Sequence, residues 1–305
     1  MAAIILVTGA TGKLGQRVVS RLLQRQAEVR VLTRRREDAQ KLWGDRVEIA
    51  EGNFSDRASL KAAARGADRV FLLSPIGETL AADQKTVIDA ALSAGISRIV
   101  KISGSDWTIG NAARSISGAA HGEVEQYLAA SGIAHTVLRP NAWMQVALEP
   151  VAAALRKGED VPARFGDAAV SFIDADDIAD VAVQALASSA PLVGPLVLTG
   201  REALTALEIA RIAARILHRP VGVSHHATPS FRRISALSNR WRSVNSENSS
   251  AKVSPHPSPT PSTISPAASP AVSKIICARG WRLPHRAIIP REKRHGADCS
   301  ITRRF

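Results

Sequence analysis

Short apolar runs alternate with longer amphipathic stretches over residues 1–223 of this chain. A short apolar run is typical of a buried strand, whereas apolar residues spaced three and four apart are typical of a helix. The strands predicted before residue 140 are residues 3–8, 29–33, 47–50, 69–73, 98–102 and 134–138. The helices predicted between them are residues 14–23, a charged helix ending near residue 42, residues 57–65 with Asp56 as N-cap, and residues 80–94 and 118–130.

This alternation predicts a parallel sheet with helices on both faces, because parallel strands are joined by crossover helices. The crossovers are expected to be right-handed. The fold class that follows is α/β, a doubly wound parallel sheet of the Rossmann type. Beyond Pro140 the pattern is less regular, and it predicts helices at about 143–155, 177–187 and 205–217, and strands at 169–173 and 195–199.

The composition is that of a globular protein. Of the 305 residues, 45% are hydrophobic and 22% are charged, which excludes global disorder. No apolar run reaches the roughly 18 residues of a membrane span. Residues 1–7 lack the basic leader and the cleavage site of a signal peptide. We therefore expect a cytoplasmic protein with no membrane partner.

The net charge of +13 is concentrated at the end of the chain. Residues 224–305 hold 14 Lys and Arg against 3 Asp and Glu, which leaves only +2 for residues 1–223. The body therefore gives no support to nucleic-acid binding, which usually needs a basic surface. Both cysteines, Cys277 and Cys299, also lie in this last segment, so neither a disulfide framework nor a cysteine metal site is expected.

The character of the sequence changes abruptly near Ser224. The segment 254–261 reads Ser-Pro-His-Pro-Ser-Pro-Thr-Pro, and no sustained periodicity follows it. One interpretation is a disordered, low-complexity basic tail over 224–305. The other is translation out of frame, since one codon choice for residues 262–281, read two nucleotides later, encodes a peptide with a globular, helical pattern. In the second case the folded part is truncated after about residue 223.

A glycine-rich loop joins the first predicted strand to the first predicted helix. Residues 8–15 read Thr-Gly-Ala-Thr-Gly-Lys-Leu-Gly, a G-x-x-G-x-x-G spacing. Gly9 permits a tight turn, Gly12 lets a diphosphate approach the backbone, and Gly15 lets helix and strand pack closely. Backbone N–H groups and the helix dipole then bind the anion. An accidental turn is the alternative, but the place at the head of a βαβ series favours a dinucleotide.

The end of the second strand distinguishes the two nicotinamide cofactors. An NAD site usually has an acidic residue there, which binds the ribose 2′-hydroxyl. Here Arg34, Arg35 and Arg36 follow the strand, and no carboxylate precedes Glu37. The guanidinium of Arg34 suits a 2′-phosphate, and Lys13 adds a second positive charge. NADP(H) is therefore favoured over NAD(H), with a solvated basic helix start as the alternative.

Several motifs of residues 1–223 together resemble the NmrA-like family of atypical short-chain dehydrogenase/reductases. The most specific is His-Gly-Glu-Val-Glu-Gln-Tyr-Leu at 121–128, which continues through 131–133 to Leu-Arg-Pro-Asn at 138–141. The other matching segments are residues 8–15, 51–56, 94–100, 103–106, 171–174, 177–179, 198–200 and 208–210.

The resemblance implies a Rossmann domain with a small C-terminal α/β substrate domain. We expect an NAD(P)-binding domain at 1–140, a smaller substrate-binding part at 141–223 that is interleaved with it, and the tail at 224–305. Family members include NAD(P)H-dependent quinone and azo-dye reductases. They also include redox-sensing regulators that bind the dinucleotide without turnover.

The resemblance also implies cofactor contacts outside the glycine loop. Asn53 stands where the family usually has an Asp near the adenine, and residues 73–75 are expected to pass the ribose and phosphates. Ser103 and Asn141 follow the fifth and sixth strands, at the sheet edge where ligands bind. The cofactor-binding residues expected together are Thr8, Gly9, Thr11, Gly12, Lys13, Leu14, Gly15, Arg34, Asn53, Phe54, Ser74, Pro75, Ser103 and Asn141.

The catalytic position departs from the best-known members of the superfamily, which use a Tyr and a Lys one helical turn later. By resemblance the equivalent pair here is His121 and Glu125, and Tyr127, the one tyrosine, is out of register. The reductase branch of the family usually shows this departure. His121 is either a polar positioner or proton donor whose ring Glu125 fixes, or half of a surface pair with no role.

Three further residues are expected to line the substrate site: Ser105, Trp107 and Trp143. A helix cap for the serine and core packing for the tryptophans are the alternatives. The first function hypothesis is an NAD(P)H-dependent reductase that transfers hydride to a quinone-like or azo acceptor, a small molecule. The second is a non-catalytic dinucleotide sensor. A homodimer is compatible with both.

The acidic residues near 174 give no metal signal. Asp174, Asp176 and Asp177 read best as a turn and a helix N-terminus, where negative charge is favoured. No histidine accompanies them, so no metal site is expected.

Overall fold

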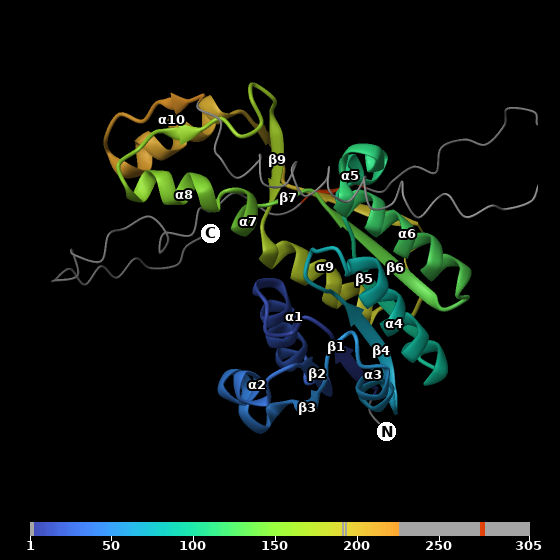
Figure 1. The fold of residues 1–305 in the computed structure, drawn as a ribbon. Coiled ribbons are helices and arrows are strands. Elements are labelled where there is room, and N and C mark those ends of the chain that lie inside the picture. Colours follow the sequence, from blue (N-terminus) through green and yellow to red (C-terminus); the bar gives the residue numbers. More distant parts are fainter. Residues whose placement is uncertain (1–2, 191, 193, 226–274, 278–305) are drawn as a thin grey trace, which may run out of the picture.

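A parallel sheet of eight strands forms the centre of the molecule, in the order β3-β2-β1-β4-β5-β6-β10-β13 (Figure 1). The structure is a computed structural model that describes residues 3–190, 192, 194–225 and 275–277. The order from β3 to β6 is that of a dinucleotide-binding doubly wound sheet. The strands are β1 (Ile4–Val7), β2 (Val29–Thr33), β3 (Glu48–Glu51), β4 (Ala67–Leu72), β5 (Arg98–Ile102), β6 (Ala134–Pro140), β10 (Pro195–Thr199) and β13 (Ile275–Cys277).

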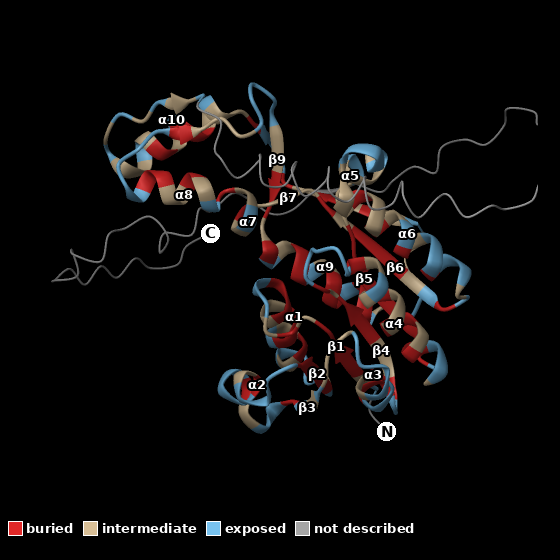
Figure 2. Ribbon diagram, in the orientation of Figure 1, coloured by how far each residue is buried: buried red, intermediate tan, exposed pale blue. Residues whose placement is uncertain are grey.

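Helices cover both faces of the sheet, as its continuous apolar strands require. Figure 2 shows the central strands β1, β2, β4 and β5 and the inward sides of these helices as largely buried. One apolar cluster joins the sheet to α1 (Lys13–Gln24), α2 (Arg36–Trp43) and α9 (Ala175–Ala187). A second joins it to α3 (Arg57–Ala64), α4 (Leu80–Ser93) and α6 (Ile116–Ala130). The short helices of this part are η1 (Gly44–Arg46), α5 (Asp106–Gly110) and η2 (Ala112–Arg114).

A smaller lobe with its own apolar cluster lies beside the sheet (Figure 1). Its elements are β7 (Ala142–Trp143), α7 (Met144–Ala147), α8 (Glu149–Arg156), β8 (Val161–Pro162), β9 (Val170–Ile173), β11 (Ala203–Leu204), α10 (Ala206–Leu217) and β12 (Val223–Ser224). Between these elements the chain returns to the sheet, where α9 packs on α1 and β10 pairs with β6. Residues 141–223 are therefore interleaved with the first part.

The doubly wound fold predicted from the hydrophobic pattern is confirmed, with each predicted strand of the sheet found within two residues of its expected ends. The single helix expected at 143–155 is wrong. The chain forms a short strand, β7, and then two helices, because it breaks at Leu148 and restarts with Pro150 in the first turn of α8.

The tail expected at 224–305 falls mostly outside the described residues. Within it, residues 275–277 form β13, which pairs in parallel with β10 through the register Val197 to Ile275. The choice between a disordered tail and translation out of frame stays a prediction. None of the described helices combines the length and apolarity that a bilayer span requires.

Thr8 ties the end of β1 to the end of β4, the two strands at the reversal point of the sheet. Its backbone N–H donates to the carbonyl of Phe71. Its hydroxyl accepts the N–H of Leu73 at 2.9 Å and donates to the carbonyl of Leu73 at 2.8 Å. The Thr8 side chain is fully buried, so no water can take the place of its hydroxyl as a hydrogen-bond partner. Thr8 therefore sets the distance between the two loops that follow these strands.

We expect Thr8→Val to reduce the free energy of unfolding by about 1–3 kcal/mol, because the isosteric change leaves buried backbone groups of Leu73 without a partner. Urea denaturation measures this loss. Thr86→Val on α4 is the matched control, because that hydroxyl only bonds the carbonyl of Ala82 in its own helix. Equal stability of both variants would contradict the prediction.

Candidate active site

The loops that follow the parallel strands gather the predicted site residues at one edge of the sheet. In a doubly wound sheet ligands bind at this carboxyl edge, at the point where the strand order reverses. Here that point lies between β1 and β4, because β2 continues the sheet on one side and β5 on the other. The glycine loop follows β1, Arg34 follows β2, and Ser103 follows β5.

The glycine loop has the geometry expected of a phosphate-binding turn. Gly9 has a positive φ of 62°, and a Cβ at Gly15 would lie 2.1 Å from the carbonyl oxygen of Gly9. Gly12 is the exposed N-cap of α1, where no side chain caps the helix and no acidic residue occupies the first turn. Leu14 is buried in the core and anchors the helix start. An uncapped N-terminus with open backbone fits the diphosphate of a dinucleotide.

Arg34 is the free cation among the arginines that follow β2. It is exposed, and within the described part of the chain its guanidinium has no hydrogen-bond or ion-pair partner. Arg35 pairs with Asp38, and Arg36 donates to the carbonyl of Ile49. Of the three, Arg34 therefore has its full donor fork open to an anion.

Lys13 and Thr11 are engaged around the loop. The ammonium of Lys13 donates to the carbonyl of Gln145 in α7 at 3.1 Å, which joins the loop to the small lobe. The carbonyl of Thr11 accepts from Gln16 at 2.7 Å. The positive charge of Lys13 remains near the loop, because its partner is a neutral carbonyl.

The loops after β3 and β4 are held by their own hydrogen bonds. The side-chain oxygen of Asn53 accepts from the N–H groups of Ser55 and Asp56, and Phe54 packs against the apolar cluster. Asn53 therefore keeps only its NH₂ group for a ligand.

Ser74 is buried after β4 and accepts a hydrogen bond from buried Gln84 at 2.9 Å, while the neighbouring Pro75 is exposed. The hydroxyl of Thr8, as described above, bonds to Leu73, the residue after β4. The Thr8 side chain thus supports the loop from inside.

A buried polar network lies under α6 where β5 and β6 end. The Nζ atom of Lys101 lies 3.1 Å from Nδ1 of His121 and 3.0 Å from Oγ of Ser103. Ser103 donates to the carboxylate of Glu125, which Arg139 binds through two nitrogens. The side chains of Glu125 and Arg139 are only 13% and 17% exposed.

Burial determines the protonation of the two basic groups in this network. Burial and then the charge of Lys101 lower the pKa of His121 to about 3. Burial also lowers the pKa of Lys101 to about 7, against the opposing effect of the Glu125 carboxylate. His121 is therefore neutral at pH 7, and its imidazolium form does not supply a proton there.

The predicted contact between His121 and Glu125 is wrong. The two residues share a helix face, but His121 is bound by Lys101 and Glu125 is bound by Ser103 and Arg139. The sequence analysis missed Lys101 and Arg139 as members of the site. A signal was present, because Lys101 interrupts the apolar run of a central strand.

Of the residues expected to line the substrate site, Ser105 caps α5 by accepting the N–H of Thr108. Trp107 is 67% exposed, and Trp143 is partly buried and packs against the first apolar cluster. Asn141 donates to the carbonyl of Ser171 at 2.7 Å and so joins β6 to β9.

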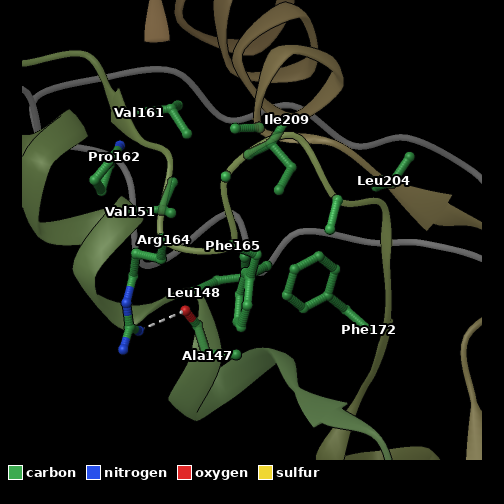
Figure 3. Close-up of a pocket in the computed structure, with 13 residues that line it drawn as sticks. Ala147, Leu148, Val151, Val161, Pro162, Arg164, Phe165, Phe172, Leu204 and Ile209 are labelled. Carbon is green, nitrogen blue, oxygen red and sulfur yellow. Dashed lines mark hydrogen bonds between the residues drawn. The ribbon is translucent and has the colours of Figure 1, made fainter. Parts of the chain in front are cut away.

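An apolar pocket lies instead in the small lobe, with Phe165 and Phe172 edge to face, ring centroids 6.2 Å apart (Figure 3). The pocket encloses about 330 Å³ including its open mouth, and neither tryptophan lines it. Arg164 is its one charged lining residue and donates to the carbonyl of Ala147. The pocket begins where α7 ends, two residues beyond the contact of Lys13.

The acidic residues near 174 form a helix start, as expected. Asp174 is the N-cap of α9 and accepts the N–H of Asp176. Within the described ranges no three His, Cys, Asp or Glu side chains form a group able to hold a metal ion.

Comparison with known proteins decides the family. The model of the NmrA-like family matches residues 1–248. The chain belongs to the NmrA-like family. This confirms the resemblance drawn from the motifs around residues 8–15 and 121–128.

Among curated relatives, the chain is similar to (4-alkanoyl-5-oxo-2,5-dihydrofuran-3-yl)methyl phosphate reductase of Streptomyces griseus, at 37% identity over 72% of this chain and 75% of the relative. It is 35% identical to NAD(P)H azoreductase of Xenophilus azovorans, over 68% and 73% of the two chains. Among solved structures, the NADPH-dependent quinone oxidoreductase of Escherichia coli complexed with NADPH aligns with a TM-score of 0.66 and 26% identity, covering 73% and 78%.

We expect Glu125→Gln to lower the free energy of unfolding by about 3–5 kcal/mol, because it removes the buried countercharge of Arg139 and leaves only the exposed Asp106 beside that guanidinium. Chemical denaturation measures the change. Glu123→Gln, two residues away on the same helix, is the matched control, since its pair with Lys85 is exposed and worth at most about 1 kcal/mol. A loss at Glu125 no larger than at Glu123 would refute a structural role for the pair.

Proposed function

We propose that this protein reduces a quinone-like or azo acceptor by hydride transfer from NADPH. The relatives named above support the broader class, and the chain is an NAD(P)H-dependent oxidoreductase of the NmrA-like type. The proposal is carried by one observation, the convergence of the uncapped α1 N-terminus, unpaired Arg34 and the His121 network on a single sheet edge.

The cofactor-binding part of the proposal follows from the first two of these features. The N–H of Gly12 donates to the carbonyl of Gly9, so the backbone N–H groups that follow Gly12 bind the diphosphate, and the N-terminus of α1 adds its dipole. The guanidinium of Arg34 binds the 2′-phosphate of NADPH, which NADH lacks. The NH₂ group of Asn53 donates to the adenosine end.

The acceptor part follows from the chemistry that the chain offers. When bound, NADPH supplies a hydride, so the acceptor gains two electrons and one hydrogen nucleus and then takes one proton to complete its reduction. No tyrosine with a lysine one turn later is present to protonate a simple ketone. His121 is neutral, so it orients the acceptor by a hydrogen bond, and water supplies the proton. Quinones and azo compounds accept hydride readily and need little more than alignment.

Arg34→Ala is expected to weaken NADPH binding by roughly 10-fold to 100-fold, the loss of a charge-assisted contact with phosphate, and to leave NADH binding unchanged. Fluorescence titration of both cofactors measures the ratio. Arg35→Ala is the matched control, because Arg35 is equally exposed but already paired with Asp38. Equal losses for NADPH and NADH in Arg34→Ala would exclude the 2′-phosphate assignment.

The acceptor class is tested by NADPH oxidation with a benzoquinone series and a set of azo dyes. We expect turnover, with rates that rise with the reduction potential of the acceptor because hydride transfer is the demanding step. NADPH binding without oxidation by any acceptor would indicate the regulatory alternative instead. Failure to bind either nicotinamide cofactor in calorimetry would overturn the whole proposal.

A further inference from the structure

Lys101 is the last residue but one of the central strand β5, and its side chain is fully buried. Its Nζ atom lies 3.3 Å from the carbonyl oxygen of Ile102, 3.0 Å from Oγ of Ser103 and 3.1 Å from Nδ1 of His121. The function proposed above gives this amine no role. Because Lys101 has no access to a ligand, any effect it has on the site must pass through one of these three neighbours.

Two of the three neighbours accept hydrogen bonds from Lys101. The carbonyl of Ile102 has no proton to donate. Ser103 donates its hydroxyl proton to the carboxylate of Glu125, so toward Lys101 its oxygen is an acceptor. The third neighbour, Nδ1 of His121, is a donor or an acceptor according to the tautomer of the ring.

The charge on Lys101 therefore determines which nitrogen of His121 carries the proton. An ammonium group has three N–H donors, and the third makes Nδ1 an acceptor, which leaves the ring proton on Nε2. A neutral amine has two N–H donors and a lone pair. With both donors engaged, the lone pair accepts a hydrogen bond from Nδ1–H, so the ring proton lies on Nδ1 and Nε2 carries none.

The surrounding charges favour the ammonium form. Glu125 of α6 pairs with Arg139 of β6, and Arg139 also pairs with Asp106 of α5. These two carboxylates balance Arg139 and a protonated Lys101, so the network is neutral only with the ammonium. Burial nevertheless lowers the pKa of Lys101 to about 7, which places the loss of its proton within a measurable pH range.

We propose that Lys101 is a positioning residue that holds His121 neutral with its proton on Nε2, from which the ring donates a hydrogen bond to the acceptor. The hydrogen bond to the acceptor rests on the proposed function, whereas the tautomer of His121 does not. Within the described residues Nε2 has no hydrogen-bond partner, and His121 keeps 5% of its surface exposed. Gly104 leaves the ring this room, since a Cβ there would lie 3.1 Å from Cδ2 of the imidazole.

The tautomer can be read directly from the imidazole ¹⁵N chemical shifts of the full chain, with His121→Gln used to assign the signal. At pH 6 we expect an unprotonated Nδ1 and a protonated Nε2. Above pH 8 we expect the proton to move toward Nδ1, because Lys101 has become neutral. An imidazolium at pH 6, or a tautomer that does not change between pH 6 and 9, would overturn the proposal without any variant.

Lys101→Met removes the amine and keeps the length of the side chain. In this variant we expect the pH dependence of the His121 tautomer to vanish, with NADPH binding as the check that the fold is intact. Lys85→Met is the matched control, because Lys85 pairs with Glu123 on the outer side of α6 and is expected to leave the tautomer unchanged. The same pH dependence in Lys101→Met as in the unsubstituted chain would refute the assignment.

The kinetic consequence separates this inference from the proposed function. Loss of one preorganised donor to a developing oxyanion lowers kcat by about 100-fold, and we expect this loss in Lys101→Met with little change in the Kd of NADPH. In the unsubstituted chain kcat should fall as pH rises through about 7, the pKa of Lys101. A pH-dependent tautomer without turnover of any acceptor would refute the proposed function but support the role of Lys101. Turnover of an acceptor with a pH-independent tautomer would support the proposed function but refute the role of Lys101.

Discussion

A lysine buried in the middle of a parallel sheet has to be surrounded by hydrogen-bond acceptors and balanced by countercharges. Lys101 meets this requirement only because α6 lies across the ends of β5 and β6 and brings His121 and Glu125 down to it. The same contacts fix the register of α6 on the sheet. Arg139 then balances the second carboxylate, so the polar groups at this edge form one connected set. The position of α6 at this edge of the sheet depends on that buried charge.

The other half of this sheet edge is built from backbone. Gly15 lets α1 pack closely on the loop at Gly9, and Thr8 holds the end of β1 beside the end of β4. These contacts leave the N-terminus of α1 without a side-chain cap at Gly12, at the same edge as the network. An uncapped helix N-terminus and a side-chain network thus lie at one sheet edge, and each is anchored in a different apolar cluster of the fold. Substitutions in one half should therefore act on the other mainly through β4 and β5.

Periodicity was enough to predict the large sheet, because buried parallel strands are continuous apolar runs and their helices repeat at fixed spacing. The glycine loop could also be predicted, because backbone contacts dictate the spacing of its glycines. The partners of His121 could not be predicted from the sequence. Spacing along a helix shows only that His121 and Glu125 share a face, whereas Lys101 reaches that face from a strand 20 residues earlier in the chain. Which strand residue meets which helix residue depends on how the helix crosses the sheet.

Under the proposed function, a neutral imidazole at this sheet edge restricts which acceptors can be reduced. An N–H of neutral imidazole can stabilise negative charge by a hydrogen bond, but it is too weak an acid to give up that proton. A ketone reduced by hydride forms an alkoxide, a strong base that needs full protonation as it forms. A quinone forms a phenolate-like anion, which a hydrogen bond stabilises well enough and which water can protonate later. Under the proposed function, the burial that keeps His121 uncharged therefore also favours quinone-like acceptors over ketones.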